Sequence, residues 1–441
     1  MKVPAYLKYK QSGVSWLGDV PQSWDVLSVK RLTPVQRGAS PRPIEDPRYF
    51  DDEGYYAWVR IADVTRNHHY LMETTQKLSD LGKSLSVPLE PGSLFLSIAG
   101  SVGKPMITKI KACIHDGFVY FPQLEIEPEF LYYIFESGQP YLGLGKLGTQ
   151  LNLNTDTVGD IKIGVPSLTE QKQIADFLDW KTGQIDGLIA KKKQLIEKLK
   201  EKRLALITQA VTKGLNPDAP IRDSGIPWLG EVPEHWEILP IKFSLSIPIT
   251  DGPHETPEIL DEGIPFLSAE AVKNDCLDFN KKRGYISQED HDRFSMKYHP
   301  RRGDIYMVKS GATTGNVARV ETEEVFNIWS PLAALRPMKE KAITDFIFYF
   351  MKSKSFFYSV ELAWSYGTQQ NIGMGVIENL KMALPPIDEQ REISKHIKIE
   401  TLFIDKMIDA CSKTIDRLTE YRTALITAAT TGKIDVRKVI F

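Results

Sequence analysis

The sequence predicts an α+β protein with two mixed α/β globular domains, each followed by a long helix, and the two helices pair as an antiparallel coiled coil. Three observations predict this fold: an internal repeat of domain size, a long helical period closing each repeat, and buried-strand patterns that end at glycine loops. The expected boundaries are 1–168 for the first globular domain, 169–213 for the first long helix, 214–387 for the second globular domain, and 388–441 for the second long helix with a C-terminal tail.

The repeat is visible at both ends of each half. SGVSWLGDVPQSW at 12–24 recurs as SGIPWLGEVPEHW at 224–236. Three further pairs of segments correspond: GTQLN at 148–152 with GTQQN at 367–371, VPSLTEQKQI at 165–174 with LPPIDEQREI at 384–393, and RLALITQAVT at 203–212 with RTALITAATT at 422–431. Residues 35–90 and 247–301 do not align convincingly, so the halves share a frame and differ in their middles.

Each half ends in a predicted helix, at 169–213 and at 388–431. Thr169 and Asp388 are N-cap candidates, with a capping box of Ser167 and Glu170 as the alternative. Apolar residues recur at near-heptad spacing: Leu178, Ile185, Leu188, Leu195, Leu199 and Leu206 in the first helix, and Ile397, Ile404, Met407, Cys411, Leu418 and Leu425 in the second. Gly214 and Pro217 give a stop signal. Two such helices in one chain bury each other's stripes; the alternative is that each packs only on its own domain.

The globular parts have both strand and helix signals. SLFLSIAG at 93–100 and DIYMVKSG at 304–311 are typical of buried strands that end at glycine loops. PEFLYYIFESG at 128–138 and TDFIFYFMKSKSFF at 344–357 are typical of amphipathic helices. The connector GLNPDAPIRD at 214–223 predicts an exposed linker.

Composition narrows the class of protein. The apolar fraction of 42% and charged fraction of 25% are ordinary for soluble globular proteins. No run of 18 apolar residues predicts a spanning helix, and MKVPAYLKYK lacks the apolar region of a secretory signal. Three scattered cysteines fit a reducing cytoplasm. The formal net charge is -2, so any nucleic-acid site must be a local patch.

Catalytic motifs are mostly missing. GLGKLG at 143–148 matches the dinucleotide fingerprint, but it follows a helical stretch rather than a strand. Gly103-Lys104-Pro105 lacks the other residues of a phosphate loop. The histidines at 68, 69, 291 and 299 have no cysteine or carboxylate framework around them in the sequence, so we expect surface or loop histidines and no metal. These absences favour a binding protein with no catalytic residue of its own.

The order of the repeated motifs resembles the DNA-specificity subunit of type I restriction–modification systems. The two Trp-Leu-Gly-x-Val-Pro-x-x-Trp segments, the two Gly-Thr-Gln-x-Asn loops and the two Pro-x-x-x-Glu-Gln helix starts at Pro166 and Pro385 carry this resemblance over essentially the whole chain. The resemblance implies that each globular part is a target recognition domain for one half of a bipartite DNA sequence. It implies that the paired helices act as a ruler and dock two modification subunits.

Cofactors would then belong to partner subunits. The resemblance implies that the modification subunits hold S-adenosylmethionine and methylate adenine at N6, and that restriction subunits, if present, use ATP and Mg²⁺. This chain would bind double-stranded DNA and hold no cofactor. Because the middles of the halves differ, we expect two different half-sites and an asymmetric target.

Candidate DNA contacts lie in glycine-bounded loops, where backbone can approach closely. In the first half they are Arg37, Arg42, Arg60 and Lys104, and in the second Lys309, Thr313 and Asn316. Four residues recur in both halves, which suits shared backbone contacts or loop architecture: Gln150, Asn152, Gln369 and Asn371. The basic run at 191–203 suggests either phosphate contacts or the solvated face of a coiled coil, and its interleaved glutamates favour the second.

Two other functions compete with this interpretation. The first is a protein scaffold with duplicated binding modules, which salt-sensitive DNA binding by the assembled complex would exclude. The second is a self-sufficient restriction–methylation enzyme, which the missing methyltransferase and nuclease motifs disfavour.

Overall fold

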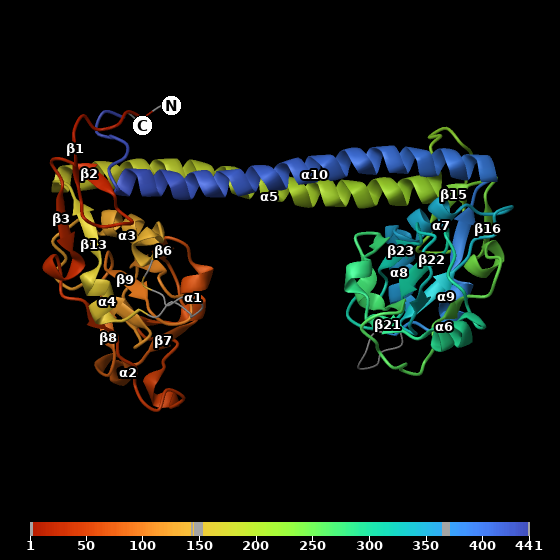
Figure 1. Ribbon diagram of the computed structural model, residues 1–441, viewed down its shortest axis with the longest axis horizontal. Coiled ribbons are helices and arrows are strands. Elements are labelled where there is room, and N and C mark those ends of the chain that lie inside the picture. Colours follow the sequence, from red (N-terminus) through yellow and green to blue (C-terminus); the bar gives the residue numbers. More distant parts are fainter. Residues whose placement is uncertain (1–2, 143, 145–152, 364–370, 440–441) are drawn as a thin grey trace. The chain divides into compact units, whose positions relative to one another are not determined.

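A computed structural model of the chain describes residues 3–142, 144, 153–363 and 371–439. They form two compact units (Figure 1). Unit 1 comprises Met1–Lys192 and Ser412–Phe441, and unit 2 is the continuous segment Lys193–Cys411. We call head 1 the described part of residues 3–166 and head 2 the described part of 214–386. Among the described residues, no helix is both long and apolar enough to cross a membrane.

Head 1 contains two larger β-sheets, with strand orders β4-β12-β9-β10-β6 and β7-β5-β11-β8. Two pairs, β1-β2 and β3-β13, complete it. The strands are β1 (Tyr9–Gln11), β2 (Asp19–Pro21), β3 (Asp25–Ser28), β4 (Gln36–Arg37), β5 (Tyr56–Val59), β6 (Tyr70–Leu71), β7 (Gln76–Leu78), β8 (Val87–Leu89), β9 (Leu94–Ser97), β10 (Pro105–Thr108), β11 (Ala112–Ile114), β12 (Phe118–Tyr120) and β13 (Lys162–Val165). Phe95, Met106 and Phe118 fill the core between the larger sheets.

Short helices cover the remaining faces of head 1: α1 (Ile61–Arg66), α2 (Asp80–Ser84), α3 (Pro128–Glu136) and α4 (Thr155–Asp160), with the 3-10 turns η1 (Val29–Arg31), η2 (Pro47–Tyr49) and η3 (Gln139–Tyr141). Six consecutive residues of α3, Phe130 to Phe135, are buried. They share one core with Leu96 and Val119 of the five-stranded sheet and with Leu178 of the first long helix. The helix α3 therefore lies between the sheet and the long helices.

Head 2 repeats most of this strand order, with one strand fewer in each larger sheet and one additional pair of strands. Its sheets are β17-β25-β22-β23 and β21-β18-β24, and its pairs are β14-β15, β16-β26 and β19-β20. The strands are β14 (Ile221–Asp223), β15 (Glu231–Pro233), β16 (Glu237–Pro240), β17 (Thr250–Asp251), β18 (Ile264–Leu267), β19 (Val272–Lys273), β20 (Cys276–Leu277), β21 (Gly284–Ile286), β22 (Ile305–Val308), β23 (Val317–Arg319), β24 (Asn327–Ile328), β25 (Leu332–Leu335) and β26 (Lys381–Leu384). The parallel pair β18-β24 corresponds to the parallel pair β5-β11. The middles that do not align in sequence therefore share a strand plan.

The helices of head 2 are α6 (Gln288–Ser295), α7 (Thr344–Met351), α8 (Lys354–Ala363) and α9 (Met374–Asn379), with the turns η4 (Ile241–Ser244), η5 (Ala269–Ala271) and η6 (Phe279–Lys281). The expected helix at 344–357 is thus two helices, because the chain turns at Lys352 and Ser353. The expected linker at 214–223 is exposed for most of its length, but its last three residues form β14.

The two long helices are α5 (Leu168–Lys213) and α10 (Ile387–Thr430). In unit 1, Leu178 near the start of α5 shares a core with Leu425 near the end of α10. In unit 2, Ala210 near the end of α5 shares a core with Ile397 near the start of α10. The helices therefore run side by side and antiparallel within each unit, as the sequence predicts (Figure 1). Helix α5 begins one residue before the expected Thr169, so the alternative cap, Ser167, precedes it.

The apolar stripe of α5 differs in part from the expected one, whereas all six positions expected for α10 are buried or half-buried. Leu188 and Leu195 are 50% and 37% exposed, whereas Ile189 and Ile196 are half-buried. Adjacent residues lie about 100° apart around a helix, so only one of each neighbouring apolar pair can face the partner. Both residues of each pair are apolar in the sequence, and the prediction selected Leu188 and Leu195, which are the exposed ones.

Candidate nucleic-acid interface

The repeated tryptophan and glutamate join each head to a long helix. Trp24 Nε1 donates to Glu170 Oε1 at 3.0 Å, and Trp236 Nε1 donates to Glu389 Oε1 at 3.1 Å. Both indoles are buried, and a buried indole N–H needs an acceptor. The two motifs found at opposite ends of each repeat therefore meet in one hydrogen bond.

The glutamine that follows each glutamate makes a second joint. Gln171 Oε1 accepts from the amide of Glu127 at 2.8 Å, and Gln390 Oε1 accepts from the amide of Ile343 at 3.0 Å. Glu127 and Ile343 are the N-cap residues of α3 and α7. Each amide group also donates to the carbonyl of a proline two residues before its long helix. The start of the long helix is thus tied to the start of a head helix.

An arginine on α10 links head 1 to both long helices. Arg422 Nη1 lies 3.1 Å from Glu136 Oε1 of α3, and its Nε lies 3.0 Å from Asp186 Oδ1 of α5. The charges of Asp186 and Glu136 raise the pKa of Arg422 above its ordinary value, although burial acts to lower it. These contacts lie within unit 1.

The equivalent arginine on α5 serves head 2. Arg203 Nη2 lies 3.3 Å from Asp275 Oδ2, and its Nε lies 3.1 Å from Asp405 Oδ1 of α10. Asp275 also pairs with Lys352 at the end of α7. Asp275 therefore lies between two cations, and the position matching Glu136 holds a lysine.

Two of the predicted contact residues of head 1, Arg37 and Arg42, converge on one residue, Asp116. Asp116 Oδ2 lies 2.9 Å from Arg42 Nη2, and Ser40 Oγ donates to Asp116 Oδ1 at 2.9 Å. Arg37 Nε donates to the main-chain carbonyl of Asp116 at 2.5 Å. Partial burial acts to raise the pKa of Asp116, but the hydrogen bond from Ser40 and the charge of Arg42 outweigh it and lower the pKa.

Arg60 and Lys104 have different surroundings. Arg60 is exposed and precedes α1. Burial lowers the pKa of the nearby His115, the charges of Arg60 and Arg37 add to this effect, and Asp116 opposes it. The ammonium of Lys104 turns inward and donates to the carbonyls of Val64 at 2.5 Å and Asn67 at 3.1 Å, near the end of α1. Burial lowers the pKa of Lys104.

In head 2 a buried carboxylate holds two lysines. Asp251 is fully buried; Lys297 Nζ lies 2.5 Å from its Oδ1, and Lys309 Nζ lies 3.2 Å from its Oδ2. His254 Nε2 lies 3.0 Å from the same Oδ2. The predicted contact Lys309 is therefore part of a charge cluster at the end of β22.

Arg37 and Asp251 occupy the same place in the two heads. Strand β4 pairs with β12 as β17 pairs with β25, and a glycine follows each strand. A Cβ atom at Gly38 would lie 2.2 Å from the carbonyl oxygen of His115, and at Gly252 1.8 Å from that of Ile328. Only glycine allows this close approach of backbones. We call the place where each of these glycines meets a neighbouring carbonyl the shared crossing. The residue before the glycine there is a cation in head 1, Arg37, and an anion in head 2, Asp251.

The remaining predicted contacts are partly described. Thr313 and Asn316 are exposed in the loop between β22 and β23, where the amide of Asn316 donates to the carbonyl of Thr313. Asn371 is exposed and forms a β-bridge with Ser310, beside Lys309. Three further predicted residues lie outside the described residues: Gln150, Asn152 and Gln369.

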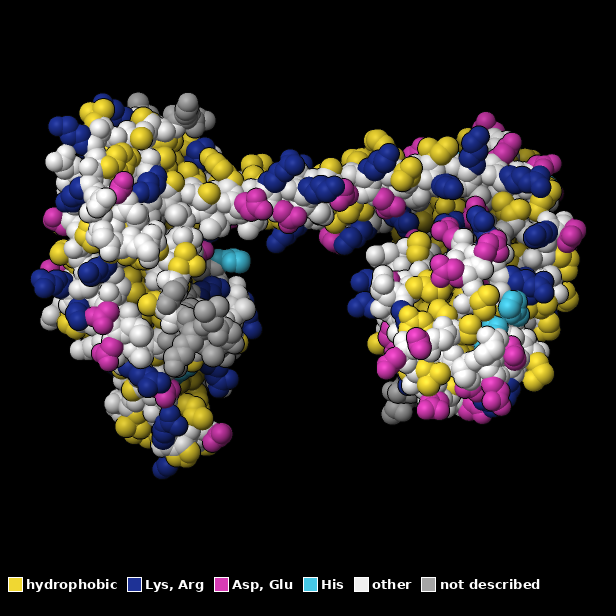
Figure 2. All heavy atoms as spheres, in the orientation of Figure 1, with side chains coloured by type: hydrophobic (Ala, Val, Ile, Leu, Met, Phe, Trp, Pro, Cys, Tyr) yellow, Lys and Arg dark blue, Asp and Glu magenta, His cyan; other side chains and the backbone are white. Residues whose placement is uncertain are grey.

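The basic run on α5 is mostly solvated. Of its members, Lys191, Lys193, Lys198, Lys200 and Lys202 are exposed, and Lys200 pairs with Glu197 at 2.9 Å. Figure 2 shows side chains of both charges along the visible face of the long helices. This arrangement fits the solvated-face interpretation.

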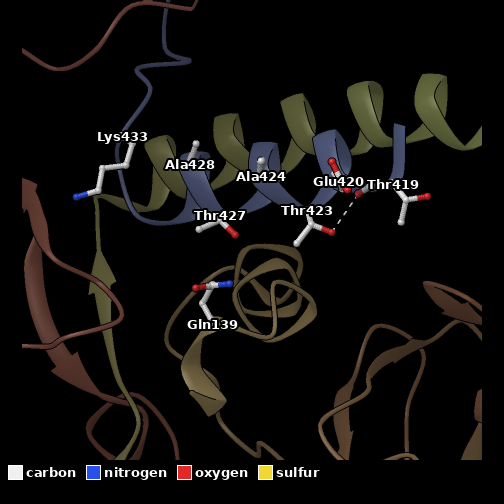
Figure 3. A pocket seen from close by; sticks show the side chains of 8 residues that line it. All are labelled: Gln139, Thr419, Glu420, Thr423, Ala424, Thr427, Ala428 and Lys433. Atoms are coloured by element: carbon white, nitrogen blue, oxygen red, sulfur yellow. Dashed lines mark hydrogen bonds between the residues drawn. The ribbon is translucent and has the colours of Figure 1, made fainter. Parts of the chain in front are cut away.

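A groove of about 590 Å³ runs along the last turns of α10 in unit 1 (Figure 3). Its lining consists mainly of small side chains: Thr419, Thr423, Ala424, Thr427 and Ala428, with Gln139, Glu420 and Lys433. Thr423 is exposed, and its Oγ1 donates to the carbonyl of Thr419, four residues earlier in the helix. The lining holds one carboxylate and one ammonium, and it has no nucleophile paired with a base.

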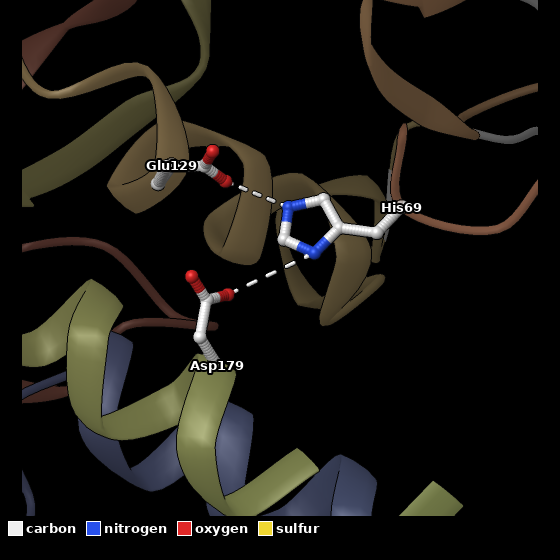
Figure 4. A group of neighbouring side chains, drawn as sticks. All are labelled: His69, Glu129 and Asp179. Atoms are coloured by element: carbon white, nitrogen blue, oxygen red, sulfur yellow. Dashed lines mark hydrogen bonds and ion pairs between the residues drawn. The ribbon is translucent and has the colours of Figure 1, made fainter. Parts of the chain in front are cut away.

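His69 contradicts the expectation of a surface histidine without carboxylates. Its Nε2 lies 2.7 Å from Glu129 Oε2, and its Nδ1 lies 3.8 Å from Asp179 Oδ1 (Figure 4). The ring stacks between Tyr70 and Tyr132, with centroids 4.1 and 3.7 Å away. The two ring nitrogens of His69 therefore lie near different carboxylates, from α3 and from α5.

Sequence reasoning missed the carboxylates that hold the predicted cations. Asp116 lies 74 residues from Arg42, and Asp251 and Lys309 are 58 positions apart in the sequence. Neither aspartate belongs to a repeated motif. Only the shared glycine after β4 and β17 could have pointed to the same crossing in both halves.

The family comparisons agree with this architecture. The family model described as type I restriction modification DNA specificity domain matches residues 21–201 and 253–405. The MjaVIII type I restriction enzyme specificity subunit of Methanocaldococcus jannaschii is 23% identical over 96% of this chain and 95% of its own length. The EcoKI specificity subunit of Escherichia coli is 22% identical over 91% and 88%. A solved structure from a study of complex assembly in the type I R-M system covers 94% of this chain and 99% of that chain with a TM-score of 0.71 at 16% identity, which shows a shared fold.

The family match covers most of both heads and part of each long helix, and the relatives match along nearly the full chain. We conclude that the chain belongs to the family of type I restriction–modification DNA-specificity subunits, the non-catalytic component that directs DNA recognition in these enzymes.

Proposed function

We propose that head 1 and head 2 each read one half of an asymmetric, split site in double-stranded DNA, and that α5 and α10 set the spacing between the halves. The observation that carries this proposal is one fold with different side chains at the same strand end. Head 1 has the exposed Arg37 at the end of β4, and head 2 has the buried Asp251 with Lys297 and Lys309 at the end of β17. Side chains read base edges, whereas phosphate contacts only position the protein. Two heads that differ at one place should therefore read different sequences.

The proposed DNA contacts remain those that the sequence suggests. They are Arg37, Arg42, Arg60, Lys104, Gln150 and Asn152 in the first half, and Lys309, Thr313, Asn316, Gln369 and Asn371 in the second. Arg37 and Arg42 have the most support because they lie together on Asp116. Lys104 has the least, since its ammonium is engaged by two carbonyls.

We also propose the partners that the family implies. Two modification subunits would hold S-adenosylmethionine and methylate adenine at N6, and restriction subunits, where present, would use ATP and Mg²⁺. The complex would act in the cytoplasm. The functional boundaries that we propose are 1–168, 169–213, 214–387 and 388–441.

The test is genome-wide mapping of N6-methyladenine in cells that lack other adenine methyltransferases. The chain is expressed together with its neighbouring modification subunit, and each is also expressed alone. We expect a split, asymmetric methylated motif only when both are present. A palindromic motif would contradict the two different half-sites. No motif from an assembled complex with a competent methyltransferase would favour a protein scaffold instead.

A further inference from the structure

Head 1 presents two arginines whose orientation is fixed by one loop. Arg37 comes from β4 and Arg42 from the segment after it, and both contact Asp116 in the loop between β11 and β12. The amide of Ala39 donates to the carbonyl of Ile114, and that of Gly38 to the carbonyl of Phe118. The segment that carries both arginines is therefore anchored by main-chain bonds on each side of Asp116.

The contacts leave hydrogen-bond donors on both guanidinium groups. Arg37 uses Nε, so its two terminal nitrogens stay available, and Arg42 uses one terminal nitrogen. The Arg42 side chain is 76% exposed. A planar guanidinium with a fixed orientation matches the O6 and N7 acceptors of guanine in the major groove.

The carboxylate of Asp116 makes a base a more favourable partner for the two arginines than a phosphate. Asp116 neutralises one of the two arginines, which weakens attraction to the DNA backbone. A carboxylate beside a phosphate contact would be unfavourable, whereas a carboxylate that holds an arginine in one orientation improves a bidentate contact.

Head 2 lacks this arrangement at the same crossing. Its cations there are Lys297 and Lys309, and the carboxylate that holds them, Asp251, is fully buried. An ammonium is a point charge that does not form the planar fork needed for guanine.

On these grounds we propose that Arg37 and Arg42 read guanine in the half-site of head 1, and that Asp116 is the positioning residue that orients them. This inference rests on the proposed function, because it assumes that head 1 reads a half-site.

The experiment uses the complex of the full chain with its modification subunit and duplexes that carry its mapped motif. Single guanines are replaced by 7-deazaguanine, which lacks N7, or by inosine, which keeps both N7 and O6. In one half-site we expect 7-deazaguanine at one position to lower the methylation rate about 5- to 150-fold, while inosine at that position has little effect.

Variants connect that guanine to head 1. Arg37→Lys or Arg42→Lys should lower discrimination between guanine and adenine at that position by a similar factor and remove the additional effect of 7-deazaguanine. Asp116→Asn should lower the same discrimination with unit 1 equally protected from proteolysis, which a purely structural role would not produce. Arg48→Lys is the matched control, because Arg48 is 74% exposed and pairs with Asp46 at 2.6 Å elsewhere in head 1.

Three outcomes would overturn the inference while methylation of the motif shows that the proposed function holds. They are a motif in which no guanine is sensitive to 7-deazaguanine, a sensitive guanine that the arginine variants leave unchanged, and arginine variants that weaken binding to all sequences equally. The last would make the pair a phosphate contact. Absence of any methylated motif would instead contradict the proposed function.

Discussion

The two junctions between head and long helix use the same shape with different charges. In unit 1, Arg422 pairs directly with Glu136 on α3. In unit 2, Lys352 stands at the matching place on α7, and Asp275 pairs with both Lys352 and Arg203. A charge reversal at one position is therefore accommodated by a third residue from a different turn. The comparison shows that both junctions share the arginine and the two long helices, whereas the acidic residue that binds the arginine comes from a different element in each unit.

The buried bonds of the joint, in contrast, are repeated without change. Trp24 and Trp236 each donate to a glutamate, and Gln171 and Gln390 each accept from a helix N-cap. Leaving a buried donor without a partner costs about 1–3 kcal/mol, whereas a solvent-exposed ion pair contributes about 0–1 kcal/mol. This difference in energy explains why the buried contacts recur and the partly exposed pairs vary.

The largest expected effect tests whether each junction between head and long helix stabilises only its own unit. Trp24→Ala and Trp236→Ala should each destabilise their own unit by about 3–5 kcal/mol, because each removes a buried indole. Hydrogen exchange read by mass spectrometry reports the units separately. Loss of protection in unit 2 on Trp24→Ala, or in unit 1 on Trp236→Ala, would show that the joints are not independent.

Asp251 should give the next largest effect and a pH dependence that head 1 lacks at this strand position. Burial acts to raise the pKa of Asp251, but hydrogen bonds and charges from Lys297 and Lys309 lower it below its ordinary value near 3.8. The stabilisation is therefore fully present above about pH 3.8 and is lost as the pH falls through the lower folded value.

Asp251→Asn should accordingly destabilise unit 2 by about 2 kcal/mol at pH 7, as expected for losing hydrogen bonds to a charged group. The difference from the unsubstituted protein should shrink as the pH falls below about 3.8. Hydrogen exchange or urea unfolding at several pH values measures it, and a difference that stays constant from pH 7 to pH 3 would assign the effect to packing rather than charge.

The charge reversal at the junction predicts unequal effects of removing the acid. Asp275→Ala should destabilise unit 2 by about 1–2 kcal/mol, because Arg203 and Lys352 then face each other without an anion. Glu136→Ala should cost about 0.5–1 kcal/mol, because Arg422 keeps Asp186. The double variant Asp275→Ala with Lys352→Ala should recover part of the loss, and the lack of any recovery would argue against the bridging role of Asp275.

The smallest effects test the seam of the long helices. Leu188→Ala and Leu195→Ala should change stability by less than about 0.5 kcal/mol, since both side chains are largely exposed. Ile189→Ala and Ile196→Ala should each cost about 1–2 kcal/mol, since both are half-buried. Thermal unfolding measures these differences. Equal losses of stability for the leucine and the isoleucine of a pair would mean that both side chains contribute equally to the contact between the long helices.

The sequence predicts the frame well and the site only in part. The repeated tryptophan, glutamate and glutamine identify the junctions between heads and long helices, because the same hydrogen bonds form in both halves. The choice between Leu188 and Ile189 depends on the facing helix, so periodicity alone does not decide it. Lys104 looks like a loop cation in the sequence, yet its ammonium lies against two carbonyls. The partners of Arg42 and Lys309 are Asp116 in a loop and Asp251 on a strand, both distant in sequence, and only the fold brings them together.

Unit 1 is built from two separated stretches of chain, with unit 2 encoded between them. During synthesis, unit 2 can complete itself while unit 1 still lacks Leu425, Ile426 and Ala429 of its core. At about 5–20 residues per second, the wait for these residues after the first stretch is roughly 10–50 s. In that interval Ile174, Phe177 and Leu178 of α5 can pack only on head 1, because their partners on α10 have not yet been made. The second stretch of unit 1 also donates from the main-chain amide of Asp435 to the carbonyl of Pro4, so the closing of unit 1 depends on residues that are made after all of unit 2.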